Sequence, residues 1–295
     1  MVNNYQIRPA LAQDQQAIAN LMFFEPHVHR HLDWYHPTDW LGSPLYWVLE
    51  RNSRILATLA CPQDQKDFTW IRLFAHVSDF SKENAWRILW DHAKNEIKKL
   101  GNIKVAAIIL HRWMQDLLVK SDFQQDQEIL MLSWEKDEPP TAKPPDGIYI
   151  RNMTLEDLPQ VVHVDSAAFD SLWQNPLSML KQAHSKSVVS TVAESPDGIL
   201  GYQISTKSPF GAHLGRLAVR PQWQRQGVAS ALLHNLLAQL VNHKITQLSV
   251  NTQSKNKSSI EFYLKNGFKY TEEAYPLFTY AVNGNGQERS KNGTP

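Results

Sequence analysis

Residues 217–233 of the 295-residue chain have the composition of an anion-binding turn. A short apolar segment ends at a proline, and a helix is expected to begin at Gly227. Gly227 and Ala229 add almost no side-chain bulk, so the backbone N–H groups from about Gln224 to Ala229 are free to face a ligand. These unpaired amides and the positive end of the helix dipole favour a pyrophosphate, and Arg225 adds a positive side chain.

Two sequence motifs, one at this turn and one further along the chain, indicate which kind of ligand-binding protein the turn belongs to. The turn matches neither nucleotide-binding fingerprint, because it contains no G-x-x-x-x-G-K-[ST] and no G-x-G-x-x-G after a first strand. Residues 224–229, Gln-Arg-Gln-Gly-Val-Ala, instead resemble the Q/R-x-x-G-x-G/A signature of the GNAT superfamily of N-acetyltransferases. Residues 256–268 resemble the second signature of that superfamily, N-x-x-S/A-x-x-F/L-Y-x-K-x-G-F, with a helix expected over 256–265 and Gly267 ending it. The motifs stand in the expected order, separated by a helix and a strand.

The resemblance implies acetyl-CoA as the cosubstrate and implies no metal. In such proteins the fourth strand and the glycine loop hold the pantetheine arm and the pyrophosphate, and the counterparts of Asn256 and Tyr263 lie beside the arm and the sulfur. The residues expected to bind acetyl-CoA are Leu217, Ala218, Val219, Gln224, Arg225, Gln226, Gly227, Val228, Ala229, Asn256 and Ser259.

Acetyl transfer to an amine needs a neutral nucleophile, a polarised thioester carbonyl and a proton for the leaving thiolate. Tyr263 is the candidate proton donor because its family counterpart lies near the sulfur. The resemblance implies that a backbone N–H at or beside Val219 polarises the carbonyl. Many relatives carry a glutamate base six residues earlier, where this chain has His213, and the ordinary histidine pKa of about 6.5 suits a base. Glu194, Asp170 and ordered water are alternative proton acceptors.

The acceptor is an amine that the sequence does not identify. Residues 169–176 occupy the place where GNAT proteins form an acceptor-facing loop, so Asp170 and Trp173 are candidate substrate contacts. The second half looks most like the ribosomal-protein N-terminal alanine acetyltransferase type, through residues 217–219 and both motifs. It departs from that type at residues 248–251, Leu-Ser-Val-Asn, which lack the usual glutamate. Protein and small-molecule acceptors both stay open.

Composition is typical of a water-soluble enzyme. The net charge of +1 indicates neither a nucleic-acid-binding surface nor a polybasic membrane patch. The single cysteine, Cys61, fits a reducing compartment, and the N-terminus lacks the basic start and apolar core of a signal peptide. The longest strongly apolar run, residues 105–110, is far shorter than the roughly 20 residues of a spanning helix. We therefore expect a cytoplasmic protein that binds no nucleic acid and no membrane, of open oligomeric state.

The sequence contains an internal repeat. Tyr5-Gln-Ile-Arg and Tyr149-Ile-Arg each precede a polar turn and an amphipathic helix, and residues 118–123 run parallel to residues 263–268. The predicted fold is α/β, with two tandem GNAT-like domains, each a mixed, splayed central sheet flanked by helices. The predicted divisions are a degenerate GNAT-like domain at 1–138, a proline-rich linker at 139–147, a catalytic GNAT domain at 148–282 and a disordered tail at 283–295.

The two copies differ where acetyl-CoA would bind. Aligning Leu73 with Leu217 places Glu83 where the second copy has Gly227, and Leu118 replaces Tyr263. Asp122 likewise replaces Gly267. We therefore expect that the first copy binds no acetyl-CoA, and that it shapes the acceptor site, packs as a pseudo-dimer partner or only stabilises the chain.

Other features of the first half support less specific predictions. The tract from Pro26 to His36 is rich in histidine, but it lacks the helical H-E-x-x-H spacing of a zinc site and is expected to be a solvated or inter-domain loop. A single strand is expected over 69–76. The tryptophans of the first half fit a groove for an apolar acceptor or core packing equally well.

The sequence as a whole favours an acetyl-CoA-dependent N-acetyltransferase that works by direct transfer in a ternary complex. The alternative is a non-catalytic CoA-sensing or peptide-binding module. Intact Gly227, Asn256 and Tyr263 favour the enzyme, since a pure interaction module has no need of all three.

Overall fold

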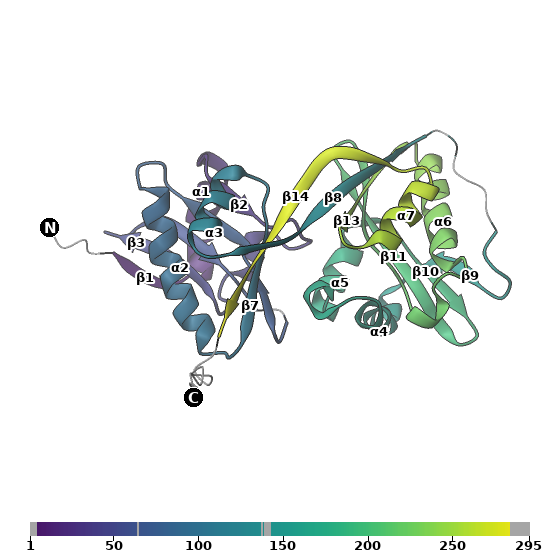
Figure 1. The fold of residues 1–295 in the computed structure, drawn as a ribbon, viewed down its shortest axis with the longest axis horizontal. Helices are drawn as coiled ribbons and strands as arrows, with labels where there is room; N and C mark the ends of the chain where they lie inside the picture. Colours follow the sequence, from purple (N-terminus) through teal and green to yellow (C-terminus); the bar gives the residue numbers. More distant parts are fainter. Residues whose placement is uncertain (1–4, 64, 137, 139–142, 284–295) are drawn as a thin grey trace, which may run out of the picture. The chain divides into compact units, whose positions relative to one another are not determined.

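The computed structural model describes residues 5–63, 65–136, 138 and 143–283, which form two compact units (Figure 1). Unit 1 contains the chain up to Asp126 together with the segment that starts at Pro276, and unit 2 contains Gln127–Tyr275. Each unit combines sheet and helices, as predicted. Of the predicted tail only Asn283 lies within the described residues, and residues 139–142 of the predicted linker lie outside them.

Unit 1 is built on a five-stranded sheet of order β1-β3-β4-β6-β2, beside which β5 pairs with β7. The strands are β1 (Gln6–Pro9), β2 (Val28–Arg30), β3 (Tyr46–Arg51), β4 (Arg54–Ala60), β5 (Phe68–Trp70), β6 (Leu73–His76) and β7 (Ile103–Ile108). The helices are α1 (Gln15–Phe24), α2 (Lys82–Lys98) and α3 (Arg112–Lys120).

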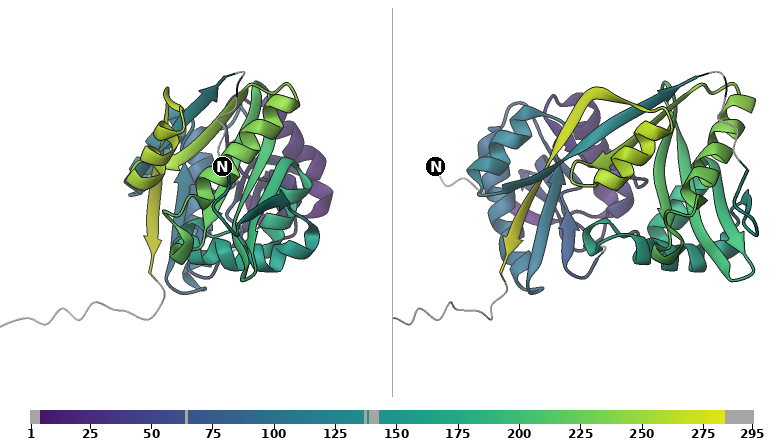
Figure 2. Two further views of the ribbon diagram at one scale, coloured as in Figure 1. Left: turned by 90° about the vertical axis from the view of Figure 1, so that its right-hand side faces the viewer. Right: turned by 45° about the vertical axis from the view of Figure 1, so that its right-hand side comes forward.

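Unit 2 has the strand order β9-β10-β11-β12-β13-β8. The strands are β8 (Gln124–Glu135), β9 (Tyr149–Asn152), β10 (Ser187–Ser195), β11 (Gly198–Ser208), β12 (Gly211–Val219) and β13 (Gln247–Gln253). The helices are α4 (Leu158–Ala168), α5 (Leu177–Ser185), α6 (Val228–Asn242) and α7 (Lys257–Lys265). Helix α6 packs on the face of β12 that carries Leu214 and Leu217, and α4 packs on the other face (Figure 2).

The two copies share the register of one parallel strand pair. In unit 1, β5 and β7 pair in parallel at three positions, and β12 and β13 of unit 2 pair in parallel at the positions 144 residues later. The shared pairs are Phe68↔Lys104, Thr69↔Val105 and Trp70↔Ala106, and Ala212↔Leu248, His213↔Ser249 and Leu214↔Val250. This register agrees with the predicted repeat of one fold.

The last strand of each copy pairs in the unit of the other copy. Strand β8 follows α3, yet its residues 129–135 pair with β13, and Trp134 is buried in the core of unit 2. Strand β14 (Lys269–Val282) follows α7, yet its residues 277–282 pair with β7, where Phe278 is buried in the core of unit 1 (Figure 1). The boundaries predicted at 138 and 148 therefore mark sequence copies, whereas the compact units change at 126 and 275.

This exchange predicts that a cut in the linker will not separate the halves. A protease site inserted within residues 139–142 would give two fragments, each of which supplies a strand to the sheet completed by the other. We expect the cut fragments to elute together in gel filtration, at the volume of the uncut chain, and to separate only in denaturant. Fragments that elute apart in native buffer would contradict the exchange.

Two predictions for the first half were wrong. The strand expected over 69–76 is two strands, β5 and β6, with different partners on either side of residues 71–72. The histidine tract is not a solvated loop, because it contains β2, which pairs with β6. His29 is only 1% exposed, its Nε2 lies 3.3 Å from the carbonyl of Ile71, and burial lowers its pKa to about 4.

Within the described residues, no group of three or more histidine, cysteine, aspartate or glutamate side chains could hold a metal ion. None of the described helices is long and apolar enough to cross a membrane.

Candidate functional site

A gap opens between two neighbouring strands of unit 2. Strand β12 pairs with β13 only over residues 212–214 among the described residues, but it continues beside β11 as far as Val219. A register shift between Ile204 and Ser205 of β11 leaves one extra residue, Gly215, on β12. The second half of β12 therefore has an open edge where β13 has diverged.

The open edge presents backbone hydrogen-bonding groups. The N–H of Arg220 donates to the carbonyl of Leu200 on β11 at 2.8 Å. Because these groups point to opposite sides at alternate residues, the N–H groups of Leu217 and Val219 point away from β11, into the gap. The side chain of Gln224 donates to the carbonyl of Val219 at 3.0 Å and so does not occupy the N–H of that residue. This is the group predicted to polarise the thioester carbonyl.

The turn after β12 concentrates backbone donors. Arg225 and Gly227 have φ angles of 60° and 85°, in the left-handed region, and such residues within a turn direct successive N–H groups into one concavity. Helix α6 then begins at Val228, and no side chain within the described residues caps its first amides. Arg225 is exposed. The turn is therefore a cradle of free N–H groups at the positive end of a 15-residue helix.

The corresponding turn of unit 1 has no such cradle. The hydroxyl of Ser81 caps α2 by accepting from the N–H of Asn84 at 3.3 Å. Glu83 adds a carboxylate to the first turn, where it opposes a bound anion. No residue from 77 to 83 has a positive φ.

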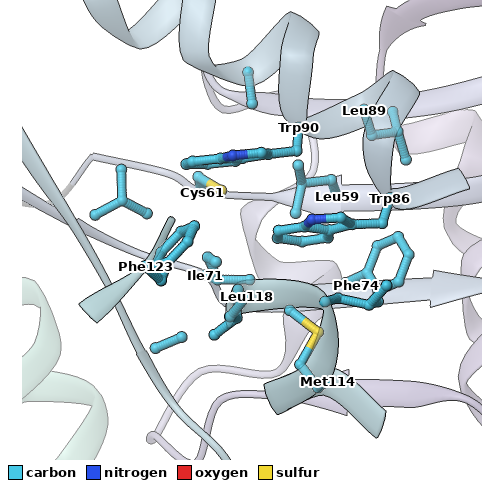
Figure 3. Close-up of a cluster of buried hydrophobic side chains, with 14 of the residues drawn as sticks. Leu59, Cys61, Ile71, Phe74, Trp86, Leu89, Trp90, Met114, Leu118 and Phe123 are labelled. Atoms are coloured by element: carbon cyan, nitrogen blue, oxygen red, sulfur yellow. The ribbon is translucent and has the colours of Figure 1, made fainter. Parts of the chain in front are cut away.

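In unit 1, large side chains fill a space that smaller side chains line in unit 2. Phe74, Trp86, Met114 and Leu118 are all at most 2% exposed and belong to one core cluster (Figure 3). The ring of Trp86 meets that of Phe74 edge-on at 5.2 Å. The corresponding positions of the second copy hold Ala218, Ser230, Ser259 and Tyr263. Three of the four large residues are thus replaced by alanine or serine, which supports a ligand site in the second copy alone.

Tyr263 lies on α7 and is almost fully buried, at 6% exposure. Its ring packs against those of Phe262 and Phe268, at centroid distances of 5.2 and 5.3 Å. Burial raises the pKa of its phenol, and the positive charge of Arg216 partly opposes that shift. The hydroxyl thus stays protonated at neutral pH, as a proton donor must.

Asn256 and Ser259 meet at the start of α7. The side-chain oxygen of Asn256 accepts from the N–H of Ser259 at 3.1 Å and so caps the helix. This contact gives Asn256 a role in folding whether or not it touches a ligand. The acetyl-CoA contacts expected of both residues stay predictions.

The candidate bases differ in their surroundings. His213 lies where β12 and β13 still pair, its Nδ1 is 2.9 Å from the hydroxyl of Ser249, and burial lowers its pKa. Glu194 forms an ion pair with Arg151 at 2.5 Å, which holds its carboxylate at the edge strand β9. Asp170 is exposed at the start of the short helix η4 (Ser171–Trp173).

The structure adds one residue that the sequence analysis missed. Arg216 stands on the unpaired half of β12, on the face toward α4, and its guanidinium binds the carboxylate of Asp165 at 2.7 and 2.9 Å. It also donates to the carbonyl of Trp173 at 2.5 Å, so this predicted substrate contact is linked to β12 through its backbone. An arginine within the apolar run Leu-Gly-Arg-Leu-Ala-Val was the signal that could have revealed it.

Comparisons with known proteins agree with this geometry. Residues 153–276 match the family model described as "Acetyltransferase (GNAT) domain". No curated protein matches the chain. A GCN5-related N-acetyltransferase from Sphaerobacter thermophilus matches 96% of this chain and 97% of its own, with a TM-score of 0.63 and 15% identity.

Two further solved structures extend over almost the whole chain. A tandem GNAT protein from the clavulanic acid biosynthesis pathway matches 95% of this chain and 99% of its own, with a TM-score of 0.64 and 14% identity. A probable N-acyltransferase from Enterococcus faecalis matches 95% of this chain and 73% of its own, with a TM-score of 0.72 and 9% identity. The predicted fold class is thus confirmed: the chain has two tandem GNAT-like domains, and the second carries the matched acetyltransferase domain.

Proposed function

We propose that this tandem GNAT protein moves an acetyl group from acetyl-CoA to a primary amine, by direct transfer in a ternary complex on its second copy. The proposal rests on two features that occur together: the open edge of β12, and the turn before α6, whose first amides no described side chain caps. Only the second copy has both, because the first copy caps its turn with Ser81 and fills the gap with Phe74, Trp86 and Met114.

In the proposed complex the pyrophosphate binds the amides of residues 225–229, since the N–H of Gln224 already donates to the carbonyl of Pro221 at 3.3 Å. The pantetheine arm follows the open edge of β12. The N–H of Val219 donates to the thioester carbonyl oxygen and stabilises the charge that develops there. The amine nitrogen attacks the carbonyl carbon, the carbon–sulfur bond breaks, and the thiolate takes a proton from the phenol of Tyr263. His213, directly or through water, accepts the proton that the amine loses. Asp170 and Trp173 contact the acceptor.

The base assignment predicts the pH dependence of transfer. Burial lowers the pKa of His213 below its ordinary value of about 6.5, so the imidazole stays neutral to lower pH than a free histidine does. We expect the acidic limb of the single-turnover pH–rate profile to lie below pH 6.5, and His213→Gln to remove that limb. An unchanged limb in His213→Gln would assign the proton to Asp170 or to ordered water.

Acetyl transfer itself is tested by incubating the protein with radiolabelled acetyl-CoA and a panel of amines, including peptides with free N-termini and small-molecule amines. We expect label in at least one acetylated amine. A protein that binds acetyl-CoA but labels no amine would favour the CoA-sensing module. A preference for peptides that begin with alanine would support the ribosomal-protein N-terminal alanine acetyltransferase type. We also propose that the protein acts in the cytoplasm.

A further inference from the structure

The side chain of Arg216 is held rigidly within unit 2. It is only 11% exposed, and the carboxylate of Asp165 is fully buried. The ring of Phe169 lies against the guanidinium, with the central carbon 3.5 Å from the ring centroid. This stack fixes the plane of the guanidinium, and the bidentate contact with Asp165 fixes its rotation within that plane.

The carboxylate of Asp165 is saturated by its partners. Besides Arg216, it accepts from the hydroxyl of Tyr202 and from the N–H of Asn175, the latter at 2.8 Å. Each oxygen thus accepts two hydrogen bonds. Asp165 therefore has no free acceptor position, and its carboxylate holds Arg216 in place.

Part of the guanidinium remains unused. Nε and Nη2 supply the bonds to Asp165 and to the carbonyl of Trp173. Nη1 donates to no group in the part of the chain that the structure describes, and it is not among the buried unpaired atoms. Two N–H donors of a nearly buried cation thus have no acceptor among the described residues, and the nitrogen that carries them is not fully buried.

An anion that reaches these donors belongs to the acceptor. The phosphates of acetyl-CoA are assigned to the turn before α6, and the acetyl and pantetheine end carries no charge. Arg216 faces α4 and η4, away from α6, and its charge partly opposes the burial that raises the pKa of Tyr263. The donors therefore stand on the acceptor side of β12, within electrostatic reach of the reacting centre.

We propose that Arg216 binds a carboxylate of the acceptor, so that the acceptor is an amine that also carries a carboxylate, as in an amino acid. This inference rests on the proposed acetyl transfer. A guanidinium pre-oriented by Asp165 and Phe169 suits this role, because little side-chain freedom is lost on binding. The carboxylate would accept from Nη1 and place the amine at the thioester.

The test compares matched acceptors: glycine with glycinamide, L-alanine with L-alaninamide, and 4-aminobutyrate with butylamine. We expect wild-type kcat/KM to favour the carboxylate member of at least one pair by about 10- to 100-fold, the range of a hydrogen bond to a charged group. The double variant Asp165→Asn/Arg216→Gln removes both charges together and so leaves no buried unpaired charge. We expect it to lose the preference.

The control is Arg151→Gln/Asp157→Asn, which removes the 2.7 Å ion pair between these two residues and also the contact of Arg151 with Glu194 at the edge strand. Because the readout is the ratio between paired acceptors, this variant should keep the preference. Equal use of both members by the wild type, or an unchanged preference in the Asp165/Arg216 variant, would overturn the inference while leaving acetyl transfer intact.

A second readout needs no turnover. N-acetylglycine and N-acetylglycinamide are titrated by calorimetry into protein saturated with CoA. Tighter binding of the carboxylate product by the wild type, lost in the Asp165/Arg216 variant, supports the inference even if no amine of the panel is acetylated. Equal binding of the two products overturns it.

Discussion

Replacing Gly227 with glutamate should abolish acetyl-CoA binding. The residue has a φ of +85°, which residues other than glycine rarely adopt. An added Cβ would also lie 3.1 Å from Cγ of Pro145. The carboxylate would also stand among the amides proposed to hold the pyrophosphate, as Glu83 does in the first copy. Calorimetry should show an affinity loss of at least 100-fold, roughly the combined effect of several lost charge-assisted hydrogen bonds.

The control separates loss of the site from strain in the chain. Gly198, in the hairpin between β10 and β11, also has a positive φ of +98°, and an added Cβ there meets only the end of the Gln160 side chain, at 3.0 Å. Gly198→Glu therefore carries similar strain and the same charge, and it should retain acetyl-CoA binding. If Gly227→Glu folds by circular dichroism and binds acetyl-CoA normally, the pyrophosphate lies elsewhere.

Replacing Tyr263 with phenylalanine should slow acetyl transfer by at least about tenfold, and by as much as the 10²–10⁴-fold of a general-acid step. The change removes the proton donor but keeps the ring that packs against Phe262 and Phe268. Single-turnover transfer from bound acetyl-CoA measures the chemical step directly, and acetyl-CoA affinity should change little.

Tyr270→Phe is the matched control, since it deletes the same hydroxyl from an exposed residue of β14 and should leave the rate unchanged. Transfer by Tyr263→Phe at the wild-type rate would make Tyr263 a packing residue. The proton for the thiolate would then come from water.

The sequence predicted the repeat and the two motifs because each depends on local geometry. Gly227 needs a left-handed backbone, and Gly267 ends a helix in the same way. The turn at the position of Gly267 persists in the first copy without glycine. Asp122 adopts a φ of 64° there, which aspartate tolerates better than most residues. A sequence pattern therefore finds the turns that contain glycine, whereas the turn at Asp122 keeps its backbone conformation without one.

Pairing partners could not be predicted in the same way. Nothing local in β8 or β14 states which sheet each strand joins, because the apolar alternation of Leu132 and Trp134 suits either core. The pairing of β2 was missed for a related reason: His29 looks polar in sequence, yet its contact with the carbonyl of Ile71 allows burial.

The site residue Arg216 was missed because its meaning lies in distant partners. The carboxylate that binds Arg216 belongs to Asp165, which is 51 positions away on α4. The sequence of β12 alone shows neither the ion pair of Arg216 nor the proposed role of His213 as a base. Only the fold brings Arg216, Asp165 and Phe169 together.

The number of acetyl-CoA molecules bound per chain tests the central claim most directly. Titration of acetyl-CoA into the full chain by calorimetry should give one site, and Gly227→Glu should remove it while Glu83→Gly should add none, because Phe74, Trp86 and Met114 still fill the gap of the first copy. Two equivalent sites, or a single site that survives Gly227→Glu in the folded chain, would contradict the assignment of acetyl-CoA to the second copy.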